Sequence, residues 1–410
     1  MGRLLWSLIL IALGVLGQMT PPNHALWYVS LGVTEWGHWL LIPILLIWWP
    51  GWQKTGAGKT AAALAVVAAG LVLMPALKAR SFAPQVQREV ETFVAAMGHA
   101  GRPAGSLVAG EGLAPTSSAG SVAARIARPS PLVLEQLFKG VPIPNVDSSS
   151  RMYVKRGERE IEMDIYMPAA QAAAPAGQTR PPVVLVFHGG ITGSTWQAGS
   201  RYEAVRFNQY LAARGYAVVS ADYRLATDAP YPAALDDALA ALAEAKRVGG
   251  PEDGAQVVVM GRAGGAHLAL MTAYASGDAA VRGVVALYPP TDLNAWAQAP
   301  SPNAVADSTG WMQTFLGTSA AGPGAALYKA ASPMSYAGGA TPTLLIHGAR
   351  DPIVPAYHSE RLAQGLRSYQ RAVLNLQLPW ATHACDSNIS GPCGQASLYA
   401  VERFLAAVLP

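Results

Sequence analysis

One short stretch constrains this chain more than any other. An apolar run at residues 257–260 ends in the pentapeptide Gly-Arg-Ala-Gly-Gly and passes into an Ala- and Leu-rich pattern typical of a helix. The glycines around the central residue predict a strand-to-helix turn so tight that side chains there would clash. A nucleophile elbow has this form and carries a serine at its centre. Here the central residue is Ala263, whose methyl group cannot attack a carbonyl.

A second apolar run, at residues 182–187, is followed by a glycine-rich loop. The run predicts a buried strand, and His188, Gly189 and Gly190 come directly after it. Backbone N–H groups in such a loop help to build an oxyanion hole, together with the N–H that follows the nucleophile position. We therefore expect an oxyanion hole formed by Gly189, Gly190 and Gly264.

Two further predicted strands end in loops that carry one acid and one histidine. Residues 343–346 lead to Asp351, and residues 374–378 lead to His383. Asp351 could alternatively cap a helix that begins near residue 355, and His383 could be an ordinary surface histidine. The chain order of Ala263, Asp351 and His383 is that of nucleophile, acid and base, which favours the catalytic interpretation.

Taken together, these segments resemble the hormone-sensitive-lipase-like branch of the α/β-hydrolase esterases. The resemblance covers roughly residues 150–410 and includes Asp222-Tyr223-Arg224 and the helix predicted to open at residues 232–239. It implies an α/β-hydrolase fold, with a mostly parallel central sheet and helices on both faces. It also implies acyl transfer from a small-molecule or lipid-like ester to water, without a cofactor. Ala263 departs from this pattern, and so does Ile191, which stands where a third glycine is common.

Three explanations of Ala263 remain open, and we favour them in the order given. In the first explanation, a serine has been replaced deliberately to hold an ester unhydrolysed. In the second, the chain is a natural pseudoenzyme that binds a ligand or protein partner. In the third explanation, another hydroxyl such as Ser194 or Ser200 has taken over. In the first two, the chain is inactive or nearly so as an esterase.

Composition argues against several other classes of function. The chain has 410 residues, of which 51% are hydrophobic and only 13% charged, and its formal net charge is +4. We find no basic block with interleaved aromatic residues, so nucleic acid is not an expected partner. Two cysteines and one histidine that already has a role make a poor ligand set, so no metal is expected.

The apolar excess lies at the start of the chain, in runs at residues 4–19, 37–49 and 61–77. The first and third runs are near the lower limit of roughly 17 residues needed to cross a bilayer, and the second reaches it only with flanking residues such as Trp36 and Trp52. Several tryptophans near the second run suit an interfacial belt. The first run alone would also suit a cleaved signal peptide, but two more runs favour a retained anchor of three transmembrane helices.

Loop charge predicts the orientation of this anchor. Lys54 and Lys59 lie between the second and third runs, whereas the loop between the first two runs has no Lys or Arg. The positive-inside rule then places the N-terminus inside and the chain after residue 77 outside, although Lys78 and Arg80 act against this orientation. The sequence thus predicts a multi-pass protein of the cell membrane with its catalytic domain on the extracytoplasmic side.

The two cysteines bracket a polar, turn-rich loop just after His383. An extracytoplasmic domain permits a disulfide between Cys385 and Cys393, which would stiffen the loop that positions the histidine. Two unpaired thiols in a reducing compartment are the alternative. The disulfide prediction is therefore tied to the predicted topology.

These observations divide the chain into three parts. Residues 1–80 are the membrane anchor, residues 81–150 a helical and flexible linker, and residues 151–410 the α/β-hydrolase domain. Residues 292–335 fall between two core strands and carry several aromatic side chains. They are interpreted as a cap over the site, with an ordinary surface excursion as the alternative.

Overall fold

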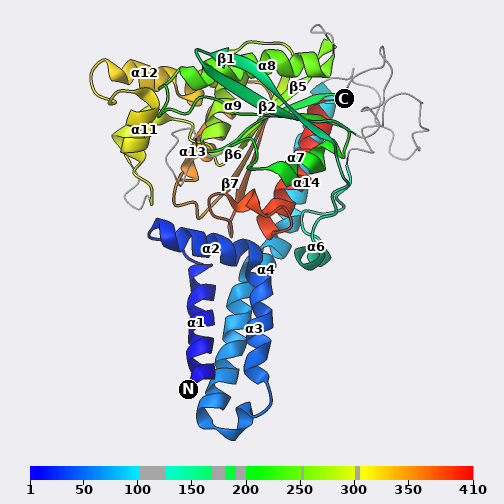
Figure 1. The fold of residues 1–410 in the computed structure, drawn as a ribbon, viewed down its shortest axis with the longest axis vertical. Helices are drawn as coiled ribbons and strands as arrows, with labels where there is room; N and C mark the ends of the chain where they lie inside the picture. Colours follow the sequence, from blue (N-terminus) through cyan, green and yellow to red (C-terminus); the bar gives the residue numbers. More distant parts are fainter. Residues whose placement is uncertain (101–125, 169–180, 191–199, 251–253, 301–304, 410) are drawn as a thin grey trace, which may run out of the picture.

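A computed structural model describes residues 1–100, 126–168, 181–190, 200–250, 254–300 and 305–409, with only the backbone of residues 99 and 100. Most of the predicted flexible linker, Ile191 and Ser194 lie outside the described residues. The chain forms an α/β domain that stands on a narrow group of N-terminal helices (Figure 1).

The α/β domain is organised around one eight-stranded sheet of order β1-β2-β4-β3-β5-β6-β7-β8. The first two strands form an antiparallel hairpin that joins the sheet through an antiparallel β2–β4 pair, and the remaining strands run parallel. The strands are β1 Ser148–Arg156, β2 Arg159–Tyr166, β3 Val183–Phe187, β4 Ala217–Ala221, β5 Val257–Arg262, β6 Val281–Leu287, β7 Thr343–Gly348 and β8 Val373–Leu378. This arrangement is the mostly parallel sheet that the sequence predicts.

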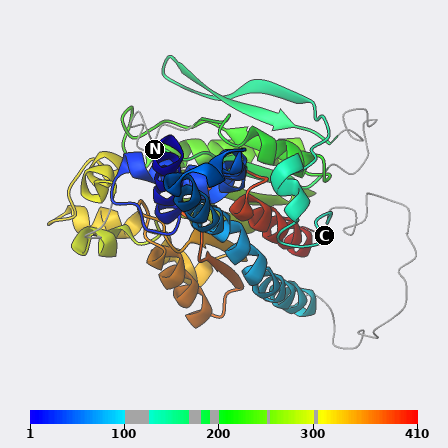
Figure 2. The same ribbon diagram turned by 90° about the horizontal axis from the view of Figure 1, so that it is seen from below.

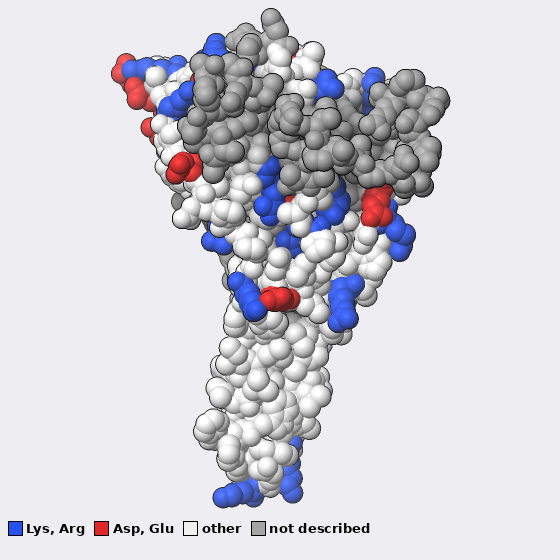
Figure 3. Space-filling view, turned by 90° about the vertical axis from the view of Figure 1, so that its right-hand side faces the viewer, with Lys and Arg blue, Asp and Glu red and all other residues white. Residues whose placement is uncertain are grey.

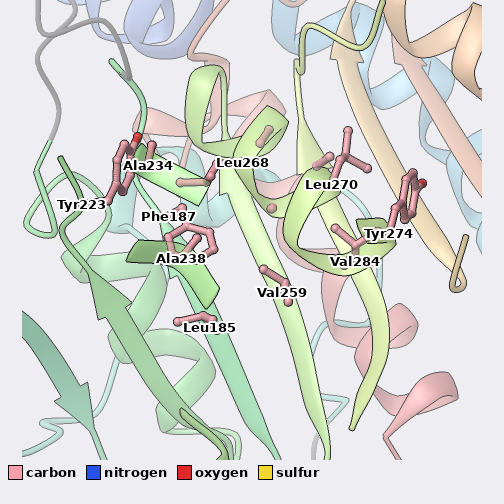
Figure 4. Packing of buried hydrophobic residues seen from close by; sticks show 14 of the residues in the cluster. Leu185, Phe187, Tyr223, Ala234, Ala238, Val259, Leu268, Leu270, Tyr274 and Val284 are labelled. Atoms are coloured by element: carbon pink, nitrogen blue, oxygen red, sulfur yellow. The ribbon is translucent and has the colours of Figure 1, made fainter. Parts of the chain in front are cut away.

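Helices cover both faces of this sheet, which explains the uninterrupted apolar runs. Along β3, Val183, Leu185 and Phe187 belong to one core cluster, whereas Val184 and Val186 belong to another on the opposite face. Figure 4 shows the first cluster, where strand side chains meet side chains of α8 and α9. The main helices of the domain are α6 Leu134–Lys139, α7 Val205–Ala212, α8 Ala233–Gly249, α9 Gly264–Ala275, α13 Tyr357–Ser368 and α14 Pro392–Val408.

The N-terminal helices form what we call the shaft, made of residues 2–16, 37–48 and 56–80. Helix α1 (Gly2–Leu16) runs toward the α/β domain, the segment built around α3 (Leu41–Leu45) runs away from it, and α4 (Gly56–Ala100) returns (Figure 1). Helix α2 (His24–Trp36) joins α1 to the α3 segment and lies across the end of the shaft, against the α/β domain. By length and composition, His24–Trp48 and Gly56–Gly98 are long and apolar enough to cross a membrane, and Gly2–Leu16 is apolar but shorter.

Close backbone packing holds the shaft together. A Cβ added to Gly14 would lie 2.6 Å from the Cβ of Leu71, and one added to Gly37 would lie 2.8 Å from the carbonyl oxygen of Val72. Small residues at such contacts let apolar helices approach closely, as they do in membranes. The outer surface of the shaft is almost free of charge, and basic residues gather at the end remote from the domain (Figure 3).

Helix α4 runs through the predicted boundary at residue 80 without a break. Beyond the shaft it continues along the α/β domain beside α14 (Figure 2), with Val86 and Val90 fully buried and Phe93 stacked on Phe404 at 5.6 Å between ring centroids. The apolar side chains of this part of α4 therefore pack against the α/β domain and belong to one of its core clusters.

We expect Phe93→Ala to lower the free energy of unfolding by about 3 kcal/mol, because it leaves a cavity between α4 and α14. Urea unfolding of the full chain in mild detergent, followed by tryptophan fluorescence, measures this. Val66→Ala on the same helix is the control, because the Val66 side chain is 62% exposed and should change stability little. Equal effects of the two substitutions would contradict the proposed packing role of α4.

Candidate active site

The strand-to-helix turn predicted at residue 263 is present between β5 and α9. Ala263 has φ 48° and ψ −118°, a conformation that few residues other than glycine adopt. Its N–H donates to the carbonyl of Leu287 at 3.0 Å, and its own carbonyl accepts from the N–H groups of Ala266 and His267. Three backbone hydrogen bonds thus hold the turn in place.

The glycines on either side of the turn are required by close approach. A Cβ on Gly261 would lie 2.1 Å from the carbonyl oxygen of Gly265, and a Cβ on Gly265 would lie 1.9 Å from that of His188. Because of the second contact, the start of α9 touches the loop after β3. The N–H of Gly264 belongs to the first turn of α9, where amide groups have no acceptor within the helix.

Hydrogen bonds and stacking fix the loop that carries Gly189 and Gly190. The ring of His188 stacks on Tyr223 at 4.4 Å, and the Tyr223 hydroxyl donates to the His188 carbonyl at 2.7 Å. The N–H of Gly189, predicted as an oxyanion donor, instead donates to a carboxylate oxygen of Glu203 at 2.7 Å. One of the three predicted oxyanion donors is therefore already hydrogen-bonded to Glu203.

Asp351 and His383, predicted as acid and base, lie side by side after β7 and β8. The Nδ1 atom of His383 is 2.7 Å from Oδ2 of Asp351, while Oδ1 of Asp351 accepts from the N–H groups of Ile353 and Val354. Burial alone would raise the pKa of Asp351. The positive character of His383 and hydrogen bonds from His347 and His383 outweigh burial and lower the pKa to about 2. Asp351 is therefore ionised at neutral pH.

Ala263 and His383 line the same cavity of about 420 Å³. Its wall also includes Gly189, Gly190 and Gly264, so the predicted nucleophile position, base and oxyanion loop all face one space. The rest of the wall comprises Trp27, Ser200, Tyr202, Glu203, Tyr288, Pro290, Trp296, Ala306, Ser308, Trp311, Ile353, Val354 and Ala384. Among the described residues, no group of three His, Cys, Asp or Glu side chains is arranged to hold a metal ion.

The segment predicted as a cap contributes directly to this cavity. It folds into α10 (Leu293–Gln298), α11 (Ser308–Leu316) and α12 (Gly324–Ala330), followed by a 3₁₀ segment. Trp296 and Trp311, from the first two of these helices, face the cavity with ring centroids 5.8 Å apart. The described part of this segment is thus one side of the site.

A disulfide joins Cys385 to Cys393, which confirms that prediction. Between the two cysteines, Asp386 accepts hydrogen bonds from Nε of Arg262 at 2.6 Å and from the hydroxyl of Tyr288 at 2.7 Å. Arg262 precedes Ala263, and the Tyr288 ring lies 4.6 Å from that of His383. The disulfide loop is therefore tied both to the turn and to the histidine.

Sequence reasoning missed several residues that line the cavity, among them Trp27, Glu203 and Tyr288. Trp27 lies on α2, in a stretch interpreted only as a loop between two membrane spans. The signal for α2 was present, since Asn23 caps the helix by accepting from the N–H of Leu26 and residues at helical spacing are buried. For Glu203 and Tyr288, no local motif indicates the contact.

Comparisons with known proteins agree with this architecture. Residues 163–366 match the sequence family described as BD-FAE. Esterase LipQ of Mycobacterium tuberculosis is 27% identical over 270 residues, which are 60% of this chain and 61% of that protein. Carboxylesterase NlhH of the same species is 30% identical over 142 residues, covering 33% of this chain and 40% of that protein.

Among solved structures, an esterase of Thermogutta terrifontis with propionate bound superposes with a TM-score of 0.51. It is 21% identical, and the match covers 64% of this chain and 96% of the esterase. At that identity the likeness concerns the fold alone. The chain spans about 60% of the length of the first relatives that it matches, LipQ and esterase LipC. The superposition supports the α/β-hydrolase fold for this chain.

Proposed function

We propose that this chain is a membrane-anchored carboxylic ester hydrolase scaffold that binds an ester but, with Ala263 at the nucleophile position, does not form an acyl-enzyme. The observation that carries the proposal is the shared cavity, which is lined by Ala263 and by a histidine that is paired with a buried carboxylate. Perturbed, paired titratable groups in a cleft beside a strained turn are typical of hydrolytic sites.

With a serine at position 263, the groups present suit acyl transfer. Ionised Asp351 accepts a hydrogen bond from the Nδ1–H group of His383, so Nε2 is left as the acceptor that takes the serine proton. The serine oxygen then attacks the ester carbonyl, the alcohol leaves with the proton held by His383, and water releases the acid in a second, equivalent step. Gly190 and Gly264 would supply N–H donors to the oxyanion, and Gly189 a third if Glu203 moves away.

Without the hydroxyl, only binding and oxyanion stabilisation remain. In related chemistry, these account for about 10³–10⁴-fold acceleration over water, several orders of magnitude below an intact triad. The site would then bind an ester without completing its hydrolysis.

A natural pseudoenzyme is the second candidate, and the contact between Gly189 and Glu203 favours it. A carboxylate on an oxyanion donor repels a developing negative charge, which suits binding better than turnover. Both candidates use the same cavity. They differ in whether restoring the hydroxyl restores activity.

We further propose three membrane spans with the α/β domain outside the cell. The weakly charged shaft supports this placement, and so does the position of Arg3, whose guanidinium donates to the carbonyl of Pro50 in the same distal loop region as Lys54. The first 22 residues of α4 alone span roughly 33 Å, enough for the hydrocarbon core. The disulfide is also consistent with an extracytoplasmic domain, because disulfides persist in oxidising compartments.

We expect Ala263→Ser to raise kcat for p-nitrophenyl butyrate by about three orders of magnitude or more, because it supplies the one missing group. The double variant Ala263→Ser/His383→Ala is the matched control and should stay near the unchanged chain. If a folded Ala263→Ser chain is not labelled by an organophosphonate, the assigned acid, base and nucleophile position are wrong, and a binding role leads.

The low pKa of Asp351 predicts a specific pH dependence of stability. Its folded value of about 2 lies below the unfolded value of about 3.9, so it contributes about 2 kcal/mol above pH 4, and this contribution is lost as the pH falls toward 2. Urea midpoints measured from pH 7 to pH 2.5 should fall more steeply for this chain than for Asp351→Asn. Parallel profiles would show that Asp351 is not held ionised by its neighbours.

Protease added to intact spheroplasts should remove the domain after residue 80 if the proposed topology is correct. A cytoplasmic marker protein must stay protected in the same sample. Complete protection of the α/β domain in sealed spheroplasts would reverse the orientation.

A further inference from the structure

The edge of the sheet that carries the site is turned toward the N-terminal helices. The loops that follow β7 and β8 contact them. In the loop after β8, the His383 carbonyl accepts from Trp27 Nε1 at 3.4 Å, and Asn388 Nδ2 donates to the Glu35 carbonyl at 3.0 Å. A guanidinium nitrogen of Arg350 donates to the carbonyl of Gly17 at 2.5 Å. The cavity, whose wall includes Trp27, therefore lies in the part of the domain nearest the shaft.

Helix α2 occupies the boundary between the shaft and the cavity. It connects α1 to the α3 segment at the end of the shaft nearest the α/β domain (Figure 1). In the proposed topology, this position is the outer surface of the membrane. Trp27 is only 6% exposed and forms part of the cavity wall, whereas Leu26, Tyr28 and Val29 beside it are 36–49% exposed. One turn of α2 thus presents apolar side chains both to the surroundings and to the cavity.

The cavity wall continues this apolar character. Besides Trp27, it includes the large apolar side chains of Trp296, Trp311, Ile353 and Val354, together with a smaller number of polar groups such as Glu203 and His383. A largely apolar wall with a few polar groups suits a molecule with a long apolar part and one ester group, because only the ester needs polar partners.

We infer that the site takes its ester from the membrane: an amphiphilic ester of the outer leaflet, whose acyl chain passes beside α2 and packs on Trp27 while its carbonyl reaches position 263. This inference rests on the proposed function and specifies its substrate class. Trp27 acts as a substrate-binding residue contributed by the membrane anchor.

The test uses the full-length Ala263→Ser chain in phosphatidylcholine vesicles and two p-nitrophenyl phosphonates. One carries an ethyl chain and stays in water, and the other carries a hexadecyl chain and enters the bilayer. Each is added to the same total concentration, and release of p-nitrophenol gives the rate of covalent labelling. We expect the hexadecyl probe to react at least about tenfold faster than the ethyl probe.

Trp27→Ala separates recognition by the cavity from simple enrichment of the probe in the bilayer. Loss of the indole should lower the hexadecyl rate about tenfold and change the ethyl rate much less, since only the long chain packs there. Trp39→Ala is the matched control, because Trp39 is an exposed tryptophan of the same N-terminal region outside the cavity wall, and its loss should leave both rates unchanged. Trp27→Phe should retain most of the hexadecyl rate and so excludes a folding defect.

The outcomes distinguish this inference from the proposed function. Labelling by the ethyl probe at an equal or higher rate would overturn the membrane route and leave the ester hydrolase scaffold standing. Equal effects of Trp27→Ala and Trp39→Ala on the hexadecyl rate would also overturn it. If neither probe labels the chain, the proposed function itself is contradicted.

Discussion

The backbone contact between the first turn of α9 and the loop after β3 is the constraint on which the site depends. The ideal Cβ position at Gly265 lies 1.9 Å from the carbonyl oxygen of His188, so no larger residue fits there without moving one of these elements. This approach brings Gly189 and Gly190 to the cavity wall beside position 263. The glycines set the geometry of the turn, whereas the side chain of residue 263 decides only whether a nucleophile is present. A serine can therefore be absent while the rest of the site is kept.

The conformation of Ala263 carries a cost. Its φ of 48° is strained for any residue with a Cβ, on the order of 1–3 kcal/mol, whereas glycine adopts such angles readily. Position 263 nevertheless keeps a Cβ, so its side chain differs from that of serine only by the hydroxyl oxygen.

The sequence could predict those site residues that follow directly after the ends of strands. The carboxyl ends of parallel strands meet at one edge of the sheet, so Asp351 and His383 could be paired from their positions after two apolar runs. Trp27 could not be found in this way, because 356 positions separate it from His383 and a hydrogen bond over that distance leaves no local pattern. The same holds for Glu203, whose contact with Gly189 depends on how two loops fold over the sheet.

The predicted boundary at residue 80 between anchor and linker lies inside helix α4, for a related physical reason. Composition changes near residue 80, but the helix does not end there, because Val86 and Val90 are buried against the α/β domain. Tertiary packing, more than local propensity, decides where such a helix stops. Removing residues 1–80 would therefore not release an intact soluble enzyme. It would take away Trp27 from the cavity and Glu35, which accepts from the N–H of Cys393 in the disulfide loop. The N-terminal helices thus contribute to the candidate site, and binding or turnover has to be measured on the whole chain.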